Sequence, residues 1–271
     1  MSSEKLFSLP VCLAGKDLEK PIVLPFLGGK VVVFTRSSPI VGHDNEDAIG
    51  VFEWQEEVGV LTVADGLGGL SGGASASRQM IECFRNLSAL DSADQVVSCI
   101  ETVNEDLLQG GSGSGTTVTV LFIQGRKVSS YHVGDSTMLI TGRRGRIKLQ
   151  TVPHSIVGNA LADGELDEKT AMQHPDRHVI YNMIGMKDMW IETTKSMQLA
   201  DLDTVILASD GIWDNLYQEE VIDMMRCRSI EKASQDLVKE ASERMNCCSI
   251  TKPGKPDDLS LILYRPGSLV K

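Results

Sequence analysis

The chain has 271 residues, of which 42% are hydrophobic and 23% charged, so it is long enough to bury a sizeable core as one domain. With 37 acidic and 26 basic residues its formal net charge is −11, which argues against a general nucleic-acid-binding or anionic membrane-binding surface. No stretch approaches the ~18 apolar residues of a membrane span. The six cysteines show no CxxC spacing, so we expect a cytoplasmic protein with reduced cysteines.

Runs rich in β-branched residues, each bounded by glycine, proline or acidic residues, predict strands. These runs lie at residues 30–35, 58–64, 116–123, 128–133, 137–141, 204–208 and 259–264. The turn sequences at 123–128 and 140–147 predict tight connections between neighbouring strands. We therefore expect antiparallel hairpins at the centre of the chain rather than parallel strands joined by helices.

Apolar residues at helical spacing predict helices at about 73–87, from Ser92 to 108, at 218–226 and at 229–245. Ser92 and Gln95 have the spacing of a capping box. The glycine-rich stretch at 110–115 is open to two interpretations, an interdomain linker or a loop that enters a strand. We favour the loop because a strand-like run follows at once, and we expect a single domain over residues 1–271.

Four short acidic segments, each following an apolar run, are the most informative feature of the chain. They lie at residues 45–47, 63–69, 208–214 and 256–260. A carboxylate just past the end of a buried strand loses solvation and repels its like-charged neighbours, so several that converge need a compensating cation. Glycines beside Asp65 and Asp210 permit close approach of backbone and ligand. Oxygen-only ligation indicates Mg²⁺ or Mn²⁺ rather than zinc.

Seven collinear motifs resemble those of the metal-dependent protein serine/threonine phosphatases of the PPM (type 2C) group. They are NEDA, VADGLGG, SGTTVTVLFI, YHVGDS, ADGELDEKTAMQHPDRHVIYNMIG, LASDGIWDNL and KPDDLSLIL. A DG dipeptide alone is a common turn, but the ordered set is specific. The bacterial-type branch fits better, because Leu67 stands where animal members have a histidine. The resemblance implies an α+β fold, a four-layer α-β-β-α sandwich of two antiparallel sheets flanked by helices, with a flap segment at about 158–185.

The resemblance also implies a site for two divalent ions at one end of the sandwich. The implied metal ligands are Glu46, Asp65, the Gly66 carbonyl, Asp210 and Asp257, with Asp214 as a ligand of a weak third ion. Asp65 bridges both ions in this scheme, and Asp47 orients metal-bound water. Asp258 is interpreted as a solvated neighbour of Asp257, and Asp135 as a residue that supports the core.

Three departures from the family pattern affect the site. Gly42 stands where relatives carry a phosphate-binding arginine, which leaves Arg36 and His43 as candidates for that role. Pro153 stands where a third-metal aspartate is expected. Leu67 removes a histidine proposed as general acid, which leaves His43, His154 or a metal-bound water.

The resemblance implies hydrolysis of phosphoserine and phosphothreonine in proteins by a water held between two Mn²⁺ or Mg²⁺ ions. The missing arginine favours an alternative, a pseudophosphatase that binds phosphoproteins without turnover. A small-molecule phosphomonoesterase would use the same site with a different groove. We expect a monomer whose partner is a phosphorylated protein substrate, with no nucleic acid and no membrane.

Overall fold

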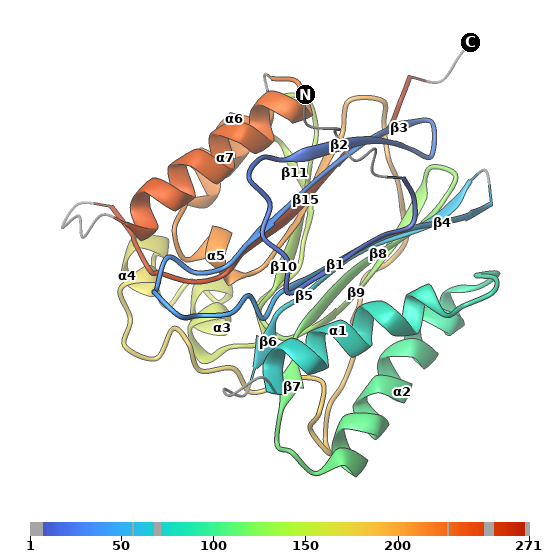
Figure 1. Cartoon of the computed structure of the whole chain (residues 1–271). Helices are drawn as coiled ribbons and strands as arrows, with labels where there is room; N and C mark the ends of the chain where they lie inside the picture. The colour runs from blue at the N-terminus through green and yellow to red at the C-terminus, as the bar shows by residue number, and fades with distance from the viewer. Residues whose placement is uncertain (1–7, 56, 68–71, 227, 247–251, 269–271) are drawn as a thin grey trace, which may run out of the picture.

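The computed structural model describes residues 8–55, 57–67, 72–226, 228–246 and 252–268. Two antiparallel sheets pack face to face, and helices cover both outer faces (Figure 1). This is the four-layer α-β-β-α sandwich that the sequence motifs predicted, so the expected fold class is confirmed. No helix in the described part of the chain is long and apolar enough to cross a membrane.

The first sheet has the strand order β1-β4-β5-β8-β9-β12, and β13 also pairs with β9. Its strands are β1 (Val11–Ala14), β4 (Ala48–Gln55), β5 (Val58–Ala64), β8 (Val118–Gln124), β9 (Lys127–Val133), β12 (Glu192–Thr193) and β13 (Met197–Gln198). The hairpin predicted between β8 and β9 is confirmed by the pairing of Gln124 with Lys127. A separate pair, β6 (Gly66–Leu67) with β7 (Gly115–Thr116), shows that the glycine-rich stretch leads into a strand.

The second sheet has the order β11-β10-β14-β15-β3-β2. Its strands are β2 (Ile22–Phe26), β3 (Gly29–Arg36), β10 (Thr137–Thr141), β11 (Ile147–Gln150), β14 (Thr204–Ala208) and β15 (Leu259–Arg265). The predicted hairpin between β10 and β11 is confirmed. The apolar faces of the two sheets meet in a central core that includes Ile49, Leu61, Leu121, Leu207 and Ile262, all fully buried.

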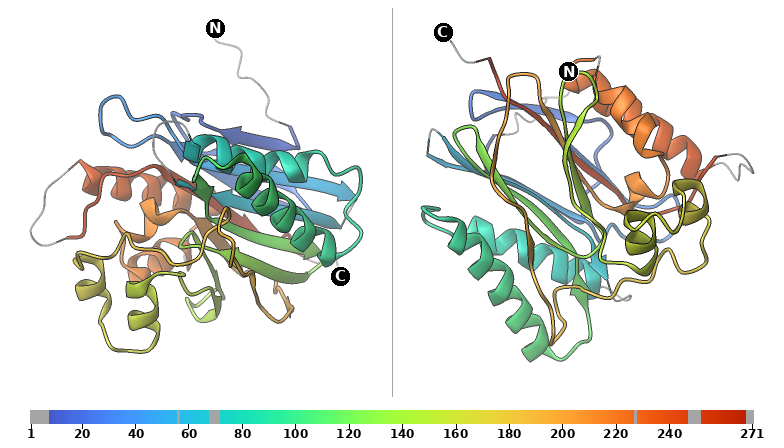
Figure 2. Two further views of the ribbon diagram at one scale, coloured as in Figure 1. Left: turned by 90° about the horizontal axis from the view of Figure 1, so that it is seen from below. Right: turned by 180° about the vertical axis from the view of Figure 1, so that it is seen from behind.

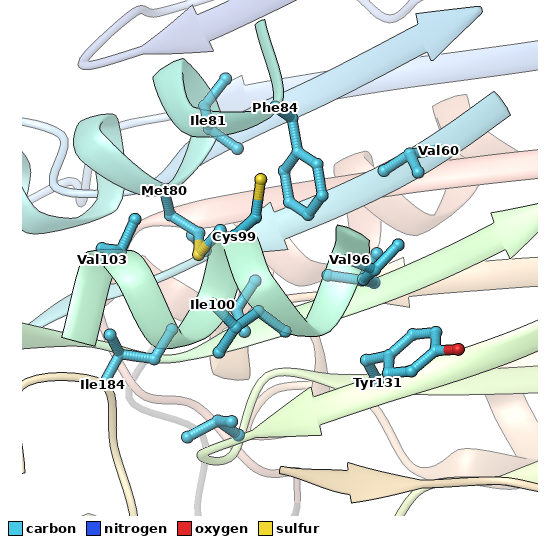
Figure 3. Close-up of a cluster of buried hydrophobic side chains, with 14 of the residues drawn as sticks. Val60, Met80, Ile81, Phe84, Val96, Cys99, Ile100, Val103, Tyr131 and Ile184 are labelled. Carbon is cyan, nitrogen blue, oxygen red and sulfur yellow. The ribbon is translucent and has the colours of Figure 1, made fainter. Parts of the chain in front are cut away.

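Helices α1 (Gly72–Arg85) and α2 (Ala93–Gly110) cover the first sheet. Figure 3 shows Met80 and Phe84 from α1 and Ile100 from α2 packing together above that sheet. The Gln95 side chain accepts the backbone N–H of Ser92 at 3.1 Å, as the capping-box spacing predicted. On the second sheet lie α5 (Asp210–Trp213), α6 (Gln218–Arg226) and α7 (Ile230–Met245).

The flap segment contains two short helices, α3 (Ile156–Ala162) and α4 (Glu168–Met172). Both views of Figure 2 place them at the same end of the sandwich as α5. Ser155 and Asp167 begin these helices, since their side chains accept the backbone N–H groups of Gly158 and Thr170 at 3.0 and 2.7 Å. The flap is therefore ordered by local capping beside the acidic segments.

Candidate metal and phosphate site

The acidic motifs meet at one edge of the sandwich because of the strand register. Asp47 precedes β4 and Asp65 follows β5, and the pairing of Ala48 with Ala64 brings these two ends side by side. In the second sheet, Asp210 follows β14 and Asp257 precedes β15, whose ends are joined by the pairing of Ala208 with Leu261. Residues from four separate segments thus converge as the motifs predicted.

Asp47 and Asp65 form the side of the site that belongs to the first sheet. Asp47 is fully buried, and its Oδ2 accepts the Ser209 hydroxyl at 2.8 Å while its Oδ1 has no hydrogen-bond partner. Removal from water raises the pKa of Asp47 well above its usual range, and the charge of Asp258 raises it further. Removal from water and the charges of Asp47 and Asp210 likewise raise the pKa of Asp65. These carboxylates therefore lack a counter-charge of their own.

Gly66 allows the chain to pass very close to the start of α1. A Cβ at position 66 would lie 2.3 Å from the backbone carbonyl carbon of Gly73 and 2.7 Å from the Glu46 carbonyl oxygen. That oxygen also accepts the Ser77 hydroxyl at 2.5 Å. The backbone beside Glu46 and Asp65 is consequently fixed by contacts that no larger residue at position 66 permits.

Lys255 lies among the carboxylates on the side of the second sheet, a contact that the sequence analysis did not anticipate. Its ammonium nitrogen is 2.6 Å from Asp210 Oδ2, 2.9 Å from Asp214 Oδ2 and 2.8 Å from Asp257 Oδ2. Burial and the charge of Asp210 nevertheless raise the pKa of Asp257 to about 7. The other oxygen of Asp210, Oδ1, is buried without a partner. A single ammonium group therefore forms ion pairs with three carboxylates.

The main chain of Lys255 is clamped by Asn215, which is fully buried at the end of α5. The Asn215 Oδ1 accepts the Lys255 N–H at 2.8 Å, and its Nδ2 donates to the Lys255 carbonyl at 3.0 Å. Arg244 of α7 donates to the Asn215 carbonyl at 2.8 Å. Asn215 thus attaches the segment before β15 to α5 through its amide side chain and to α7 through its backbone carbonyl.

Asp135 belongs to the acidic group rather than to the apolar core, which corrects its interpretation as a residue that supports the core. It follows β9 and lines a cavity together with Asp210 and Asp214. Removal from water and the charges of those two residues raise the pKa of Asp135 to about 8. Asp214 therefore has a carboxylate neighbour, although Pro153, which lines the same cavity, supplies none.

Asp258 is not a solvated neighbour of Asp257, as the sequence analysis expected, but a buried structural residue. It is 5% exposed, and it accepts the backbone N–H groups of Ser38 and Glu46, each at 2.7 Å. His43 Nε2 lies 3.2 Å from its Oδ1. Two adjacent aspartates thus have opposite roles, because Asp257 faces Lys255 and Asp258 faces the loop before β4.

Arg36 is bound elsewhere, so the structure does not place it as a phosphate ligand. Its guanidinium donates to the Leu18 carbonyl at 2.8 and 3.2 Å and to the Glu19 carbonyl at 3.0 Å, and it lies 5.1 Å from the Phe34 ring centroid. His43 keeps 37% of its side chain exposed beside Asp258. Of the two candidates, His43 alone remains close to the acidic residues with an exposed ring.

A cavity of about 130 Å³ lies between the flap and the acidic cluster. Apolar groups of Val157, Leu161 and Met172 form part of its wall, and Asp214 also lines it. Arg177 also lines it. Burial and the charge of Asp210 raise the pKa of Asp214, and the charges of Lys255 and Arg177 partly oppose that rise. Arg177 lies within the fifth sequence motif, but nothing in the local sequence distinguishes it from a solvated flap residue.

His154 is a structural residue, which argues against its candidacy as general acid. Its Nδ1 accepts the Gly134 N–H at 3.1 Å and lies 2.8 Å from Asn182 Nδ2, while its Nε2 lies 3.1 Å from Glu192 Oε2. The residue is 3% exposed. Both ring nitrogens thus hold the flap to β9 and β12, and neither is available for a substrate.

The oxygen atoms of this site are of the kind that coordinate a hard divalent ion. The carboxylates, however, are not arranged in a coordination geometry as they stand. The unpartnered oxygens of Asp47 and Asp210 are buried beside the oxygen-rich group that surrounds Asp65. Across the described ranges, no group of three or more histidine, cysteine, aspartate or glutamate side chains is arranged to hold a metal as it stands. The Asp210, Asp214 and Asp257 carboxylates are engaged by Lys255 instead.

Comparison with known proteins agrees with the fold and the motifs. A family model described as protein phosphatase 2C matches residues 36–245. The serine/threonine phosphatase stp of Listeria welshimeri is 26% identical over 217 residues, covering 74% of this chain and 86% of that protein. The solved S. agalactiae serine/threonine phosphatase has a TM-score of 0.75 at 25% identity, covering 88% of this chain and 99% of that one.

A solved catalytic domain of the phosphatase PstP, in complex with two manganese ions, has the same fold. Its TM-score is 0.69 at 19% identity, and the match covers 87% of this chain and 96% of that one. The bacterial origin of these neighbours agrees with the branch that Leu67 indicated. Since the family model spans most of the sequence and the strand order builds the expected sandwich, the chain belongs to the protein phosphatase 2C family.

Proposed function

We propose that the protein is a divalent-metal-dependent phosphatase that hydrolyses phosphoserine and phosphothreonine in protein substrates. The observation that carries the proposal is the convergence of Asp47, Asp65, Asp210 and Asp257 from both sheets at one edge of a protein phosphatase 2C fold. The oxygen-only donors suit Mn²⁺ or Mg²⁺. The solved PstP domain with two manganese ions supports this choice.

Glu46, Asp65 and the Gly66 carbonyl are the proposed ligands on the side of the first sheet, and Asp210 and Asp257 those on the side of the second. Asp47, which is buried and hydrogen-bonded to Ser209, is the proposed residue that orients water beside Asp65. A divalent ion bound here supplies a Lewis acid that makes water a better nucleophile and neutralises charge on the phosphoryl oxygens. Asp214 and Asp135 are the proposed ligands of an additional ion that binds more weakly.

Two cationic or hydrogen-bonding side chains near the acidic residues are the proposed contacts for the substrate phosphate. His43 is exposed on the loop before β4, and Arg177 faces the cavity from the flap. We infer that these two residues, rather than Arg36, compensate for Gly42. A charge-assisted hydrogen bond to a phosphate oxygen is worth roughly 1.5–3 kcal/mol, so loss of either contact weakens substrate binding about tenfold or more.

The decisive experiment follows phosphate release from a phosphothreonine peptide with Mn²⁺ and with EDTA, and uses Asp65→Asn as the matched inactive control. Release that needs Mn²⁺ and Asp65 supports a protein phosphatase. Binding of the peptide without release would establish the pseudophosphatase alternative. Hydrolysis of small aryl phosphates without hydrolysis of the peptide would indicate a small-molecule phosphomonoesterase. We also infer that the chain acts as a monomer with one catalytic domain, which sedimentation of the purified protein would test.

A further inference from the structure

Lys255 differs from an ordinary surface lysine in how completely its ammonium is used. An ammonium has three N–H donors. Its nitrogen lies within 2.9 Å of Asp210, Asp214 and Asp257, and its side chain is 20% exposed. With three acceptors at hydrogen-bonding distance, no donor is left for a phosphate oxygen. The geometry therefore argues for a role toward the carboxylates rather than toward the substrate.

The position of Lys255 is built into the fold and does not depend on its own side chain. Asn215 binds both the N–H and the carbonyl of Lys255, and Asn215 is itself fully buried. Lys252, three residues earlier in the same segment, makes an ion pair with Glu240 and is 53% exposed. The chain thus directs one lysine of this segment into the acidic cluster and the other toward the surface.

Two of the three carboxylates that Lys255 binds, Asp210 and Asp257, are the proposed metal ligands of the second sheet. The ammonium nitrogen lies 2.6 Å from one carboxylate oxygen and 2.8 Å from the other. An oxygen that accepts an ammonium hydrogen cannot coordinate a metal ion through the same lone pair. Two cations placed between the same carboxylates would also repel each other strongly. Binding of the ammonium therefore competes with binding of a divalent ion through the Oδ2 atoms of Asp210 and Asp257.

We propose that Lys255 is an internal competitor of the divalent metal, whose ammonium takes the place of one cation between Asp210, Asp214 and Asp257 and must be displaced before a metal ion binds there. The inference rests on the proposed metal-dependent function. It assigns to this chain a requirement for a high concentration of Mn²⁺ or Mg²⁺ at one of its positions. The Glu46 and Asp65 side, which Lys255 does not contact, binds its ion without this competition.

The test is calorimetric titration of Mn²⁺ into the metal-free full-length protein and into Lys255→Met, with Lys252→Met as the matched control. We expect Lys255→Met to bind Mn²⁺ at the weaker position roughly tenfold or more tightly, since each charge-assisted hydrogen bond given up corresponds to about a factor of ten. Lys252→Met should match the wild type. Lys255→Gln provides a second neutral variant if Lys255→Met does not fold.

Thermal unfolding in EDTA supplies a readout that does not depend on metal. Loss of the ammonium leaves three carboxylates unbalanced, so we expect Lys255→Met to melt at a lower temperature than the wild type in EDTA and to gain more from added Mn²⁺. Unchanged Mn²⁺ affinity in both neutral variants, while the wild type binds Mn²⁺, would overturn the competition but leave the proposed function intact. Failure of every protein to bind Mn²⁺ would overturn both.

Discussion

The carboxylate of Asp258 accepts the backbone N–H of Glu46 at 2.7 Å, which joins the last acidic motif of the chain to the first. The same side chain accepts the Ser38 N–H, and His43 lies 3.2 Å from it. The loop before β4, which carries a proposed metal ligand, is thus held by a residue of the opposite sheet. Asp258 connects the two halves of the site although it is directed away from Lys255.

Asp258→Asn should reduce both stability and turnover. An amide nitrogen in place of one oxygen faces backbone N–H donors at Ser38 or Glu46, and an unsatisfied buried donor costs roughly 1–3 kcal/mol. Urea unfolding of the variant measures the loss, with Asp44→Asn, an exposed aspartate of the same loop, as control. Equal unfolding free energies for wild type and Asp258→Asn would show that Asp258 does not hold the loop.

Asp65→Asn should abolish turnover while making the metal-free protein more stable. The folded-state pKa of Asp65 is raised above its unfolded value, so at neutral pH the ionised carboxylate opposes folding, and a neutral amide removes that cost. We expect turnover to fall by orders of magnitude because a proposed metal ligand is lost. The melting temperature in EDTA at pH 7 and phosphate release with Mn²⁺ check the two parts. A lower melting temperature in EDTA contradicts the electrostatic argument.

Arg36→Ala should lower stability and leave the KM for a phosphopeptide unchanged, because Arg36 binds the Leu18 and Glu19 carbonyls. Arg177→Ala and His43→Ala should each raise KM about tenfold, in line with the roughly 1.5–3 kcal/mol of a charge-assisted hydrogen bond to phosphate. Steady-state kinetics on the three variants distinguishes these roles. A large rise in KM for Arg36→Ala alone would restore Arg36 as the phosphate anchor.

The Arg244 network should make part of the stability depend on acidic pH. Arg244 is 4% exposed and pairs with Glu220 at 2.6 Å and with Glu240 at 2.9 Å. Burial raises the pKa of Glu220, but hydrogen bonds from Arg244 and the Tyr217 N–H, together with the charges of Arg244 and Lys252, lower it on balance. The Glu220 contribution is therefore present above the unfolded pKa of 4.5 and is lost as the pH falls through the lower folded value.

Arg244→Met tests this dependence. The variant should unfold more easily at pH 7, because the Asn215 carbonyl and the carboxylates of Glu220 and Glu240 each lose a partner, although Glu240 keeps Lys252. Its difference from the wild type should shrink as the pH falls below about 4.5 toward the folded pKa of Glu220. Unfolding free energies across this range supply the measurement. If the difference in unfolding free energy between the variant and the wild type stays constant with pH, Arg244 stabilises the protein through packing alone.

The sequence predicted the principal strands and helices because each is long and regularly patterned. β1 and β2 were missed, since proline, glycine and charged residues surround or interrupt these short runs. β4 was also missed, because Gly50, Glu53 and Trp54 break its run of β-branched residues. Pairing with neighbouring strands determines that these segments are strands. This information comes from the tertiary structure rather than from the local sequence.

The motifs located most of the acidic residues but not the side chains that control their charge. A lysine within GKPDD resembles a solvated loop residue, and only the approach of α5 brings Lys255 to three carboxylates. Similarly, nothing local distinguishes Asp257 from Asp258. Their opposite directions follow from the alternation of side chains at the start of β15, combined with the position of the loop before β4.

The site forms only where the two sheets pack together. Asp47 and Asp65 lie at the edge of one sheet, and Asp210 and Asp257 at the edge of the other. The apolar layer between the sheets, with Leu61 and Ile262 fully buried in it, sets the spacing of the carboxylates. A compact acid state that keeps its strands but loosens this layer should retain the proposed ligands and lose their geometry. We therefore expect neither sheet, separated from the other, to carry a residual fraction of the proposed activity.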